Sequence, residues 1–264
     1  MSKLYPVGVQ NFEKVILGGY EYVDKTALIY ELFNTGSYYF LSRPRRFGKS
    51  LLLSTLEAYA QGKKELFKGL ALEKLEKDWT VYPVLHLDLN TQKYDSPESL
   101  TNVLEENVRN WEALYGASSA EIGVARRFQG LIRRACEQTG RRVVILIDEY
   151  DKPMLQAIGN EALQNEYRST LKAFYGALKS MDGCIRFALL TGVTKFGKVS
   201  VFSDLNNLMD ISMDDRYVEI CGISEKEVHA YFEEDIHELA TATGMSYEQA
   251  CAELKANYDG YHFT

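Results

Sequence analysis

Three consecutive residues, Gly48-Lys49-Ser50, have the types and the order needed to bind phosphate. They lie between an apolar run at residues 38–41, which predicts a strand, and a leucine-rich segment, which predicts a helix. A glycine lets backbone amides approach phosphate oxygens, a lysine reaches the terminal phosphates of a nucleotide, and a serine hydroxyl can ligate Mg²⁺. A full Walker A motif has another glycine five positions before Gly48, where this sequence has Arg43. Taken alone, the motif leaves a phosphate-binding loop and a chance loop equally open.

The acidic pair Asp148-Glu149 directly follows a continuous apolar run at residues 143–147, as in a Walker B strand. Such a β-branched run is typical of a parallel strand that is buried on both faces. An aspartate at the end of this strand can hold Mg²⁺ next to Ser50, and the following glutamate can orient and polarise an attacking water. We therefore predict Ser50 and Asp148 as metal-binding residues and Glu149 as a catalytic residue. The pair could instead end a strand and cap the next helix, but its presence together with the phosphate-binding motif favours nucleotide binding.

A threonine follows a third apolar run. Residues 185–190 predict a strand, and Thr191 at its end would lie near the terminal phosphate of a nucleotide and near the attacking water. We predict Thr191 and Lys49 as catalytic residues. Thr194 and Asn206-Asn207 are close in sequence and could act similarly, although ordinary hydrogen bonding in a turn explains them equally well.

Basic residues precede and flank the phosphate-binding motif. Arg43, Arg45 and Arg46 add positive charge beside the expected phosphates, and a nucleotide is a simpler partner for them than DNA. The residues of this segment that we predict to contact the nucleotide are Arg45, Arg46, Phe47, Gly48, Lys49, Ser50 and Leu51.

The segments around these motifs alternate between strand and helix patterns. Apolar runs predict strands at residues 38–41, 84–89, 143–147 and 185–190. Helices are predicted after Asp24, after Ser50, and over residues 97–115, 120–138 and 162–179. This alternation argues for an α/β fold, with a parallel sheet covered by helices. Two further predictions are a hairpin at residues 15–23, with its turn at Gly18-Gly19, and a last strand at residues 217–220.

The composition changes towards the C-terminal part of the chain. The 264 residues have a net charge of -7, with 46% hydrophobic and 25% charged residues, which is ordinary for a globular protein. Residues 204–264 contain 14 acidic and three basic residues, a net charge of -11, whereas the rest has +4. This step fits a module boundary and a set of solvated helix faces equally well. Ser224 with Glu227, and Ser246 with Gln249, are capping boxes that predict two helices there.

Composition also argues against two classes of partner. The acidic balance gives no support for nucleic-acid binding. No apolar stretch approaches the roughly 20 residues that span a bilayer, and the first residues lack the apolar core of a signal peptide. We therefore expect a cytoplasmic protein with no membrane partner.

Five motifs follow one another along the chain and are more specific together than singly. They are Tyr22-Val23-Asp24-Lys25-Thr26, Arg43-Pro44-Arg45-Arg46-Phe47-Gly48-Lys49-Ser50, Leu146-Ile147-Asp148-Glu149-Tyr150-Asp151, Thr191-Gly192-Val193-Thr194-Lys195-Phe196 and Tyr258-Asp259-Gly260-Tyr261. In this order they resemble the bacterial and archaeal AAA-ATPase-like family over essentially the whole chain, and the loop variant with Arg43 is itself a mark of that family. The resemblance implies an additional-strand P-loop ATPase (P-loop NTPase) fold, close to the AAA+ and signal-transduction ATPases. It also implies that Asp24 and Lys25 lie near the nucleotide.

Members of that family commonly continue into a C-terminal domain similar to PD-(D/E)xK nucleases. The sequence stops at Thr264, soon after the last motif, so we expect a chain truncated before such a partner domain. The local Glu253-Leu254-Lys255 lies in a helical pattern rather than on the strand that such nucleases need. We therefore assign no nuclease activity to it, and we expect nucleic acid to be a partner only indirectly.

The residues and the resemblance together predict an ATPase with ATP and Mg²⁺ as its cofactors. We expect a P-loop ATPase domain over residues 1–222 that hydrolyses the γ-phosphate of ATP. Residues 223–264 would form a helical extension, or lid, that couples the nucleotide state to a C-terminal effector domain. Two alternatives stay open, a non-catalytic nucleotide-binding or interaction module and a small-molecule phosphotransferase. The sequence does not indicate the oligomeric state.

Overall fold

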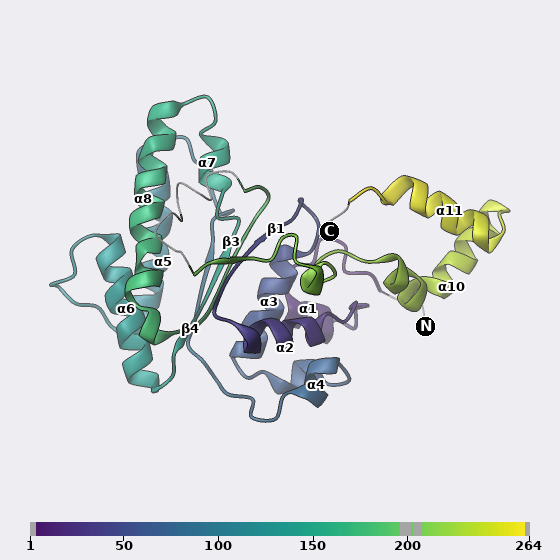
Figure 1. Ribbon diagram of the computed structural model, residues 1–264, viewed down its shortest axis with the longest axis horizontal. Coiled ribbons are helices and arrows are strands. Elements are labelled where there is room, and N and C mark those ends of the chain that lie inside the picture. Colours follow the sequence, from purple (N-terminus) through teal and green to yellow (C-terminus); the bar gives the residue numbers. More distant parts are fainter. Residues whose placement is uncertain (1–3, 196–201, 203–206, 262–264) are drawn as a thin grey trace.

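Five parallel strands form the central sheet of the computed structural model, which describes residues 4–195, 202 and 207–261 (Figure 1). The strands are β1 (Tyr38–Ser42), β2 (Val84–Asp88), β3 (Val143–Asp148), β4 (Ile185–Gly192) and β5 (Met209–Asp210). Their order across the sheet is β2-β3-β4-β1-β5. All neighbouring strands pair in parallel, so their carboxyl ends lie along one edge of the sheet.

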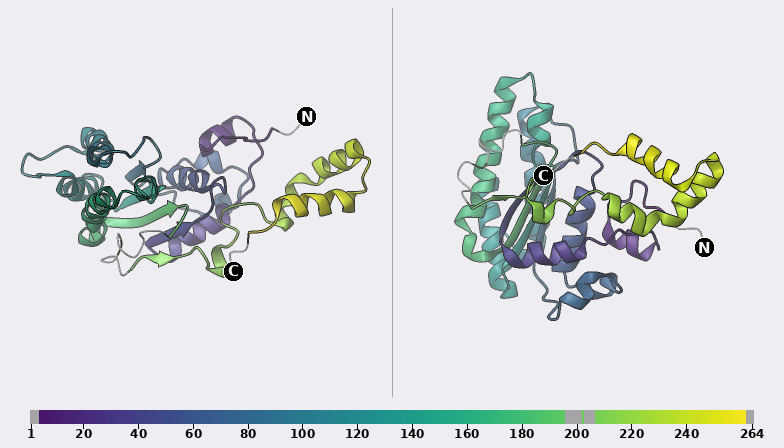
Figure 2. Two further views of the ribbon diagram at one scale, coloured as in Figure 1. Left: turned by 90° about the horizontal axis from the view of Figure 1, so that it is seen from above. Right: turned by 45° about the vertical axis from the view of Figure 1, so that its right-hand side comes forward.

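Helices cover both faces of this sheet, because alternate side chains of each strand enter two separate apolar layers. The first layer includes Phe40 and Ile145 and lies under α5 (Pro97–Tyr115), α6 (Val124–Thr139) and α8 (Glu161–Ser180). The second layer includes Leu146 and Leu189 and lies under α1 (Phe12–Leu17), α2 (Thr26–Thr35), α3 (Lys49–Ala60) and α4 (Ala71–Leu75). The right-hand view of Figure 2 shows the teal helices on one side of the sheet and the purple and blue helices on the other. This three-layer arrangement confirms the predicted α/β class with a helix-covered parallel sheet.

The remaining short elements connect these layers. They are the helix α7 (Lys152–Gln156) and the 3₁₀ turns η1 (Lys64–Phe67), η2 (Asp182–Cys184) and η3 (Asp215–Tyr217).

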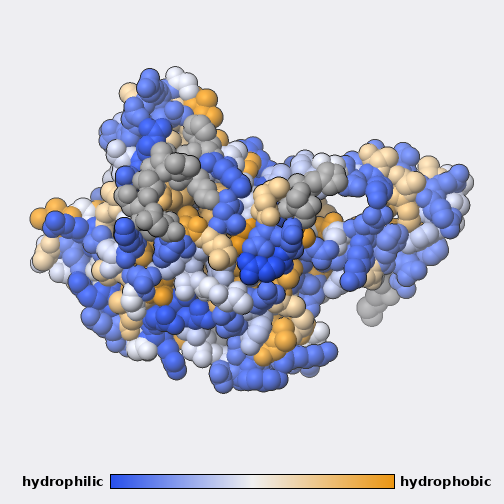
Figure 3. All heavy atoms as spheres, viewed as in Figure 1, coloured by the Kyte–Doolittle hydropathy of each residue, from blue (hydrophilic) through white to orange (hydrophobic). Residues whose placement is uncertain are grey.

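Two helices, α10 (Glu225–Thr243) and α11 (Tyr247–Tyr258), form a hairpin that projects from the sheet and its helices (Figure 1, right). Both predicted capping boxes are present at their first turns. The two helices pack on each other around a small cluster of buried residues, Ile236, Ala240 and Ala250. In Figure 3 the hairpin, at the right, carries many hydrophilic side chains with apolar ones between them, which agrees with solvated helix faces.

The hairpin predicted at residues 15–23 is wrong. Residues 12–17 form α1, and the Asn11 side chain caps this helix by accepting a 2.9 Å hydrogen bond from the Lys14 amide. Phe12 and Val15, three residues apart, are fully buried, whereas Leu17 is 72% exposed. In a strand, every second residue faces the core, so Phe12 and Val15 would point to opposite faces. A spacing of three places both on one face of a helix, and the β-prone run therefore belongs to an amphipathic helix.

The strand predicted at residues 217–220 is also wrong. The Asp214 carboxylate accepts the amide N–H of Arg216 at 3.1 Å and so starts the 3₁₀ turn η3. The fifth strand is instead the two-residue β5, which pairs with β1 at Tyr39 and Phe40. A strand this short leaves too few residues for a periodic pattern to reveal it.

The other predicted strands are present within one or two residues of their predicted ends, and α5 begins at Pro97 after a Ser96 cap as predicted. Among the helices of the described ranges, none combines the length and the apolar character that crossing a bilayer requires.

One ion pair across the second apolar layer makes stability depend on pH. His86 Nδ1 on β2 lies 2.8 Å from Glu57 Oε2 on α3, and both side chains are about one-third exposed. Burial disfavours the charged imidazole, but the hydrogen bond and the charge of Glu57 outweigh it and hold the pKa of His86 above its ordinary 6.5. Burial likewise opposes the charged carboxylate, yet the same pair holds the pKa of Glu57 below its ordinary 4.5.

We expect the pair to stabilise the fold most between pH 4.5 and 6.5. The raised pKa of His86 gives a contribution that is lost as the pH rises, and the lowered pKa of Glu57 gives one that is lost as the pH falls. His86→Gln should lower the free energy of unfolding by up to about 1 kcal/mol near pH 5.5 and by less near pH 8. Urea unfolding at both pH values measures this. An equal loss at both values would contradict it, and Glu57→Gln should show the same pH dependence.

Candidate functional site

Three segments meet at the side chain of Asp148, at the carboxyl edge of the sheet. Ser50 in the first turn of α3 donates its hydroxyl to Asp148 Oδ2 at 2.5 Å, and Thr191 in β4 donates its hydroxyl to Asp148 Oδ1 at 2.5 Å. The alternation that puts Leu146 and Leu189 under α3 puts Asp148 and Thr191 on the same face. The structure therefore brings together three residues that the sequence predicted for one site.

The segment of residues 43–48, here called the β1–α3 loop, curls around the N-terminus of α3. Arg46 and Gly48 have positive φ angles of 69° and 85°. Left-handed residues in a tight loop turn successive backbone N–H groups inward, and the first N–H groups of a helix have no partners within the helix. This combination of loop and helix N-terminus is the geometry that favours anion binding in proteins.

Lys49 is buried beneath this loop, with a side chain only 4% exposed. Its Nζ donates to the carbonyl oxygens of Arg43 at 3.2 Å and Pro44 at 3.3 Å, and it lies 3.2 Å from Glu149 Oε1. These oxygens compensate for the burial of the ammonium group. They are also the partners that a phosphate oxygen would replace.

Glu149 has a strained backbone directly after β3. Its φ of 53° is left-handed, a conformation that costs roughly 1–2 kcal/mol for a residue with a side chain. Burial raises the pKa of its carboxyl; the nearby Lys49 opposes this rise, and Asp148 adds to it. Strained residues and raised carboxyl pKa values are both concentrated at functional sites.

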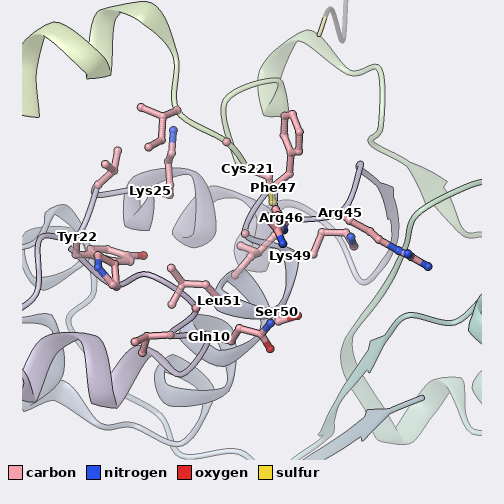
Figure 4. A pocket seen from close by; sticks show the side chains of 18 of the residues that line it. Gln10, Tyr22, Lys25, Arg45, Arg46, Phe47, Lys49, Ser50, Leu51 and Cys221 are labelled. Atoms are coloured by element: carbon pink, nitrogen blue, oxygen red, sulfur yellow. The ribbon is translucent and has the colours of Figure 1, made fainter. Parts of the chain in front are cut away.

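A cleft of about 770 Å³ opens above these residues (Figure 4). Residues 45–52 line it, so every residue of this segment that the sequence predicted to contact a nucleotide faces the cleft. The opposite wall comes from residues 5–10 and 21–23, and a third side from residues 220–223. Figure 4 shows Tyr22 and Lys25 on the side across from Phe47 and Lys49.

The structure separates the two predicted residues Asp24 and Lys25. Lys25 lines the cleft, and its Nζ forms a close ion pair with both carboxylate oxygens of Glu227 in α10. The Asp24 carboxylate accepts hydrogen bonds from Thr26 and from the Ala71 amide. Asp24 is not among the cleft-lining residues of the part of the chain that the structure describes. Its role here is to join α2 to α4.

Thr191 likewise stands behind the cleft rather than in it. Its side chain is fully buried and bonded to Asp148, and it is not among the described residues that line the cleft. Thr194 bonds the buried Asp151, Asn207 lies in a turn, and Asn206 is outside the described residues. The predicted contact of Thr191 with the terminal phosphate therefore has no direct path in this geometry.

Arg43 does not add charge beside the cleft, which corrects the sequence prediction. Its side chain is buried, with the residue only 1% exposed, and it donates to the carbonyl oxygens of Ser42, Ser212 and Tyr217. The guanidinium thereby links the end of β1 to the segment after β5. Arg45 and Arg46, in contrast, are exposed and line the cleft.

Sequence reasoning missed most of the wall opposite the β1–α3 loop. The cleft is also lined by residues 5–10, Asp88, Lys152 and Phe232. Of these, only Asp88 could have been found from the sequence, because it is an acidic residue at the end of a predicted strand. Cys221 also lines the cleft, and burial raises the pKa of its thiol to about 12. That thiol stays protonated at neutral pH and is unsuited to act as a nucleophile.

A parallel sheet with a tight loop before a helix and a strand-end carboxylate at its carboxyl edge is typical of proteins that bind phosphate-bearing ligands. The chain belongs to the family described as "Predicted AAA-ATPase", whose model matches residues 6–202. This membership confirms the resemblance seen in the motifs and suggests nucleotide binding.

One curated relative comes from Azotobacter chroococcum mcd 1 and is described as "Uncharacterized protein in vnfD 5'region". It is 40% identical over 264 residues, which cover 99% of this chain and 49% of the relative. The chain therefore spans about half the length of that relative. No solved structure matches the chain.

Because the Arg43 side chain is buried and hydrogen-bonded, we expect that replacing it with the usual Walker A glycine destabilises the fold. Arg43→Gly restores the usual residue but leaves the carbonyl oxygens of Ser212 and Tyr217 without their donor. We expect the free energy of unfolding to fall by about 2–4 kcal/mol. Urea denaturation measures this, with the exposed Arg45→Gly as the matched control that should change stability by about 0.5 kcal/mol or less. Equal stability of the two variants would contradict the structural role of Arg43.

Proposed function

We propose that this chain is an ATP-binding module that hydrolyses ATP with Mg²⁺, and that it belongs to the additional-strand class of P-loop ATPases. The convergence of Ser50, Thr191 and Glu149 on Asp148, with Lys49 beside Glu149, is the observation that carries the proposal. The sheet order supports the class, because β4 lies between β1, which leads into the loop, and β3, which ends in Asp148.

Lys49 and the backbone of the β1–α3 loop bind the phosphates in this proposal. The Nζ of Lys49 exchanges the carbonyl oxygens of Arg43 and Pro44 for phosphate oxygens, so its burial stays compensated. The exposed side chains of Arg45 and Arg46 add positive charge at the mouth of the cleft. Leu51 and Phe47 contribute apolar surface beside the loop.

Ser50 and Asp148 are the residues that would hold Mg²⁺. Their hydroxyl and carboxylate oxygens are the hard ligands that this ion prefers, and they already lie 2.5 Å apart. When bound, Mg²⁺ neutralises charge on the phosphate oxygens. Thr191 keeps the Asp148 carboxylate turned towards Ser50, so we assign it a positioning role rather than direct contact with phosphate.

Glu149 orients the attacking water and accepts its proton. Its carboxylate lines the cleft beside Lys49, and the raised pKa makes it a better proton acceptor than an ordinary glutamate. When Lys49 turns to phosphate, the Glu149 carboxylate is released from the ion pair and becomes available to water. Nucleotide binding and activation of the base are thereby linked through one lysine.

The ion pair between Lys25 and Glu227 supports coupling between the cleft and the α10–α11 hairpin. Glu227 also accepts the Ser224 amide and hydroxyl, so the carboxylate that caps α10 is the one that binds Lys25 in the cleft wall. One turn later, the hydroxyl of Tyr231 accepts the amide N–H of Asp24 at 3.1 Å. A nucleotide that moves Lys25 would therefore change how α10 is held, which would report its state to a further, nuclease-like effector domain in a longer chain.

Single substitutions separate this function from its alternatives. We expect Lys49→Ala to lose ATP binding, and Glu149→Gln to bind ATP while its turnover falls by about 10²–10⁴-fold. Phosphate release and equilibrium binding of labelled ATP measure the two effects. Lys64→Ala and Glu65→Gln, two exposed residues in η1, are matched controls that should leave both unchanged.

Each other outcome of these assays favours a different function. ATP binding by the wild type without phosphate release would favour the non-catalytic nucleotide-binding module. Transfer of the labelled phosphoryl group to a metabolite would favour the phosphotransferase. If the wild type binds neither ATP nor GTP, both enzymatic functions and the nucleotide-binding module are refuted, and only an interaction module remains.

The link between the cleft and α10 has its own test. Glu227→Gln removes the charge that pairs with Lys25, leaving a lysine that is only 9% exposed without that partner. We expect amide hydrogen exchange in the first turns of α10 to become faster. Glu225→Gln, on the same helix as Glu227, breaks an exposed pair with Lys255 of α11; it is the control and should have little effect. Equal exchange in both variants would contradict the coupling.

A further inference from the structure

The carboxylate of Asp151, just beyond β3, has no role in the mechanism above and is completely buried. It accepts the amide N–H of Val193 at 3.2 Å, the amide N–H of Thr194 at 2.8 Å and the hydroxyl of Thr194 at 2.9 Å. Burying a carboxylate is favourable only when donors of this kind surround it. Asp151 therefore fixes the turn that follows β4.

The neighbouring Tyr150 binds both ends of the same turn. Its amide N–H donates to the Thr191 carbonyl at 2.9 Å, and its hydroxyl donates to the Thr194 carbonyl at 3.0 Å. Gly192 lies against it, and a Cβ atom there would come within 2.5 Å of the Tyr150 ring. The pair Tyr150-Asp151 and the turn at residues 191–194 thus form one interlocked unit.

Glu149 is held between two fixed points as a result. On one side, Asp148 is bonded to Ser50 and Thr191. On the other, Tyr150 and Asp151 are bonded to the turn after β4. A left-handed φ at a residue with a side chain persists only where the surroundings impose it. The two anchors supply that constraint.

We infer that Asp151 is a positioning residue for Glu149: by holding the turn at residues 192–194 it fixes the left-handed backbone that directs the Glu149 carboxylate into the cleft. Asp151 does not act on a ligand itself, since it is not among the cleft-lining residues of the described chain. The effect on catalysis rests on the proposed ATPase activity, whereas the effect on the backbone of Glu149 does not.

Asp151→Asn tests the inference with two measurements. The three donors from Val193 and Thr194 all bond the same carboxylate oxygen, Oδ2, and a neutral amide oxygen is a weaker acceptor for them than a charged carboxylate. The other carboxylate oxygen, Oδ1, lies 3.3 Å from the Val193 amide N–H, and the amide NH₂ that replaces it cannot accept this bond. In a crystal structure of this variant we expect the φ of Glu149 to leave the left-handed region. We also expect kcat for ATP hydrolysis to fall on the order of 10²-fold while KM for ATP stays within about twofold, because a displaced base affects the reacting geometry and not the binding of phosphate.

Two further variants distinguish a change in the position of Glu149 from a general loss of stability. Thr194→Val removes the hydroxyl bond to Asp151 and keeps the bond from its amide N–H, and it should lower kcat by about tenfold with a normal thermal midpoint. Asp182→Asn is the matched control, because Asp182 accepts a hydrogen bond from Tyr38 near the opposite end of β4, and its kcat should not change.

The inference is overturned if Glu149 keeps its φ near 53° in Asp151→Asn, or if kcat in that variant and in Thr194→Val equals that of the wild type. A loss of kcat in Asp182→Asn as large as in Asp151→Asn would also overturn it. If the wild type does not hydrolyse ATP, the proposed function fails, and the φ of Glu149 in the variant still decides the inference.

Discussion

The carboxylate of Asp148 accepts one hydroxyl from α3 and another from β4, and the construction of the cleft follows from this shared acceptor. Because Asp148 is only 4% exposed, its charge needs donors on both oxygens. Ser50 can reach it only if the β1–α3 loop is folded back, and Thr191 only if β4 lies beside β3. The hydrogen bonds of one side chain thus tie the loop, the sheet order and the position of Glu149 together.

The parts of this arrangement that could be predicted from the sequence are those with local signals. The run at residues 143–147 is long, apolar and β-branched, and the acidic pair after it marks the carboxyl end of a strand. Gly48-Lys49-Ser50 is equally local, because a loop and the first turn of one helix supply all its groups. For the same reason the capping boxes predicted the starts of α10 and α11 correctly.

The parts that could not be predicted depend on contacts between distant segments. The sequence around Arg43 predicts that it faces phosphate, yet the carbonyl oxygens that hold it belong to residues about 170 positions away. Residues 15–17 have the composition of a strand, but the Phe12 side chain is buried in the second apolar layer and its amide N–H donates to the Ser54 hydroxyl of α3. These contacts and the Asn11 cap make the segment helical. Asp24 and Lys25 are adjacent in the chain, but one holds α4 and the other pairs with α10.

The pairing of Lys25 with Glu227 has a consequence for how the molecule is made. The two residues are 202 positions apart, so a ribosome that has just added Lys25 must add about 200 further residues before its partner exists. Contacts this distant in sequence form late, since the chain must close a long loop to make them. The sheet edge around Asp148 can thus be complete while one wall of the cleft is still missing. Until then, the cleft of the nascent protein lacks the side formed by residues 220–223, and Lys25 has no Glu227 with which to pair.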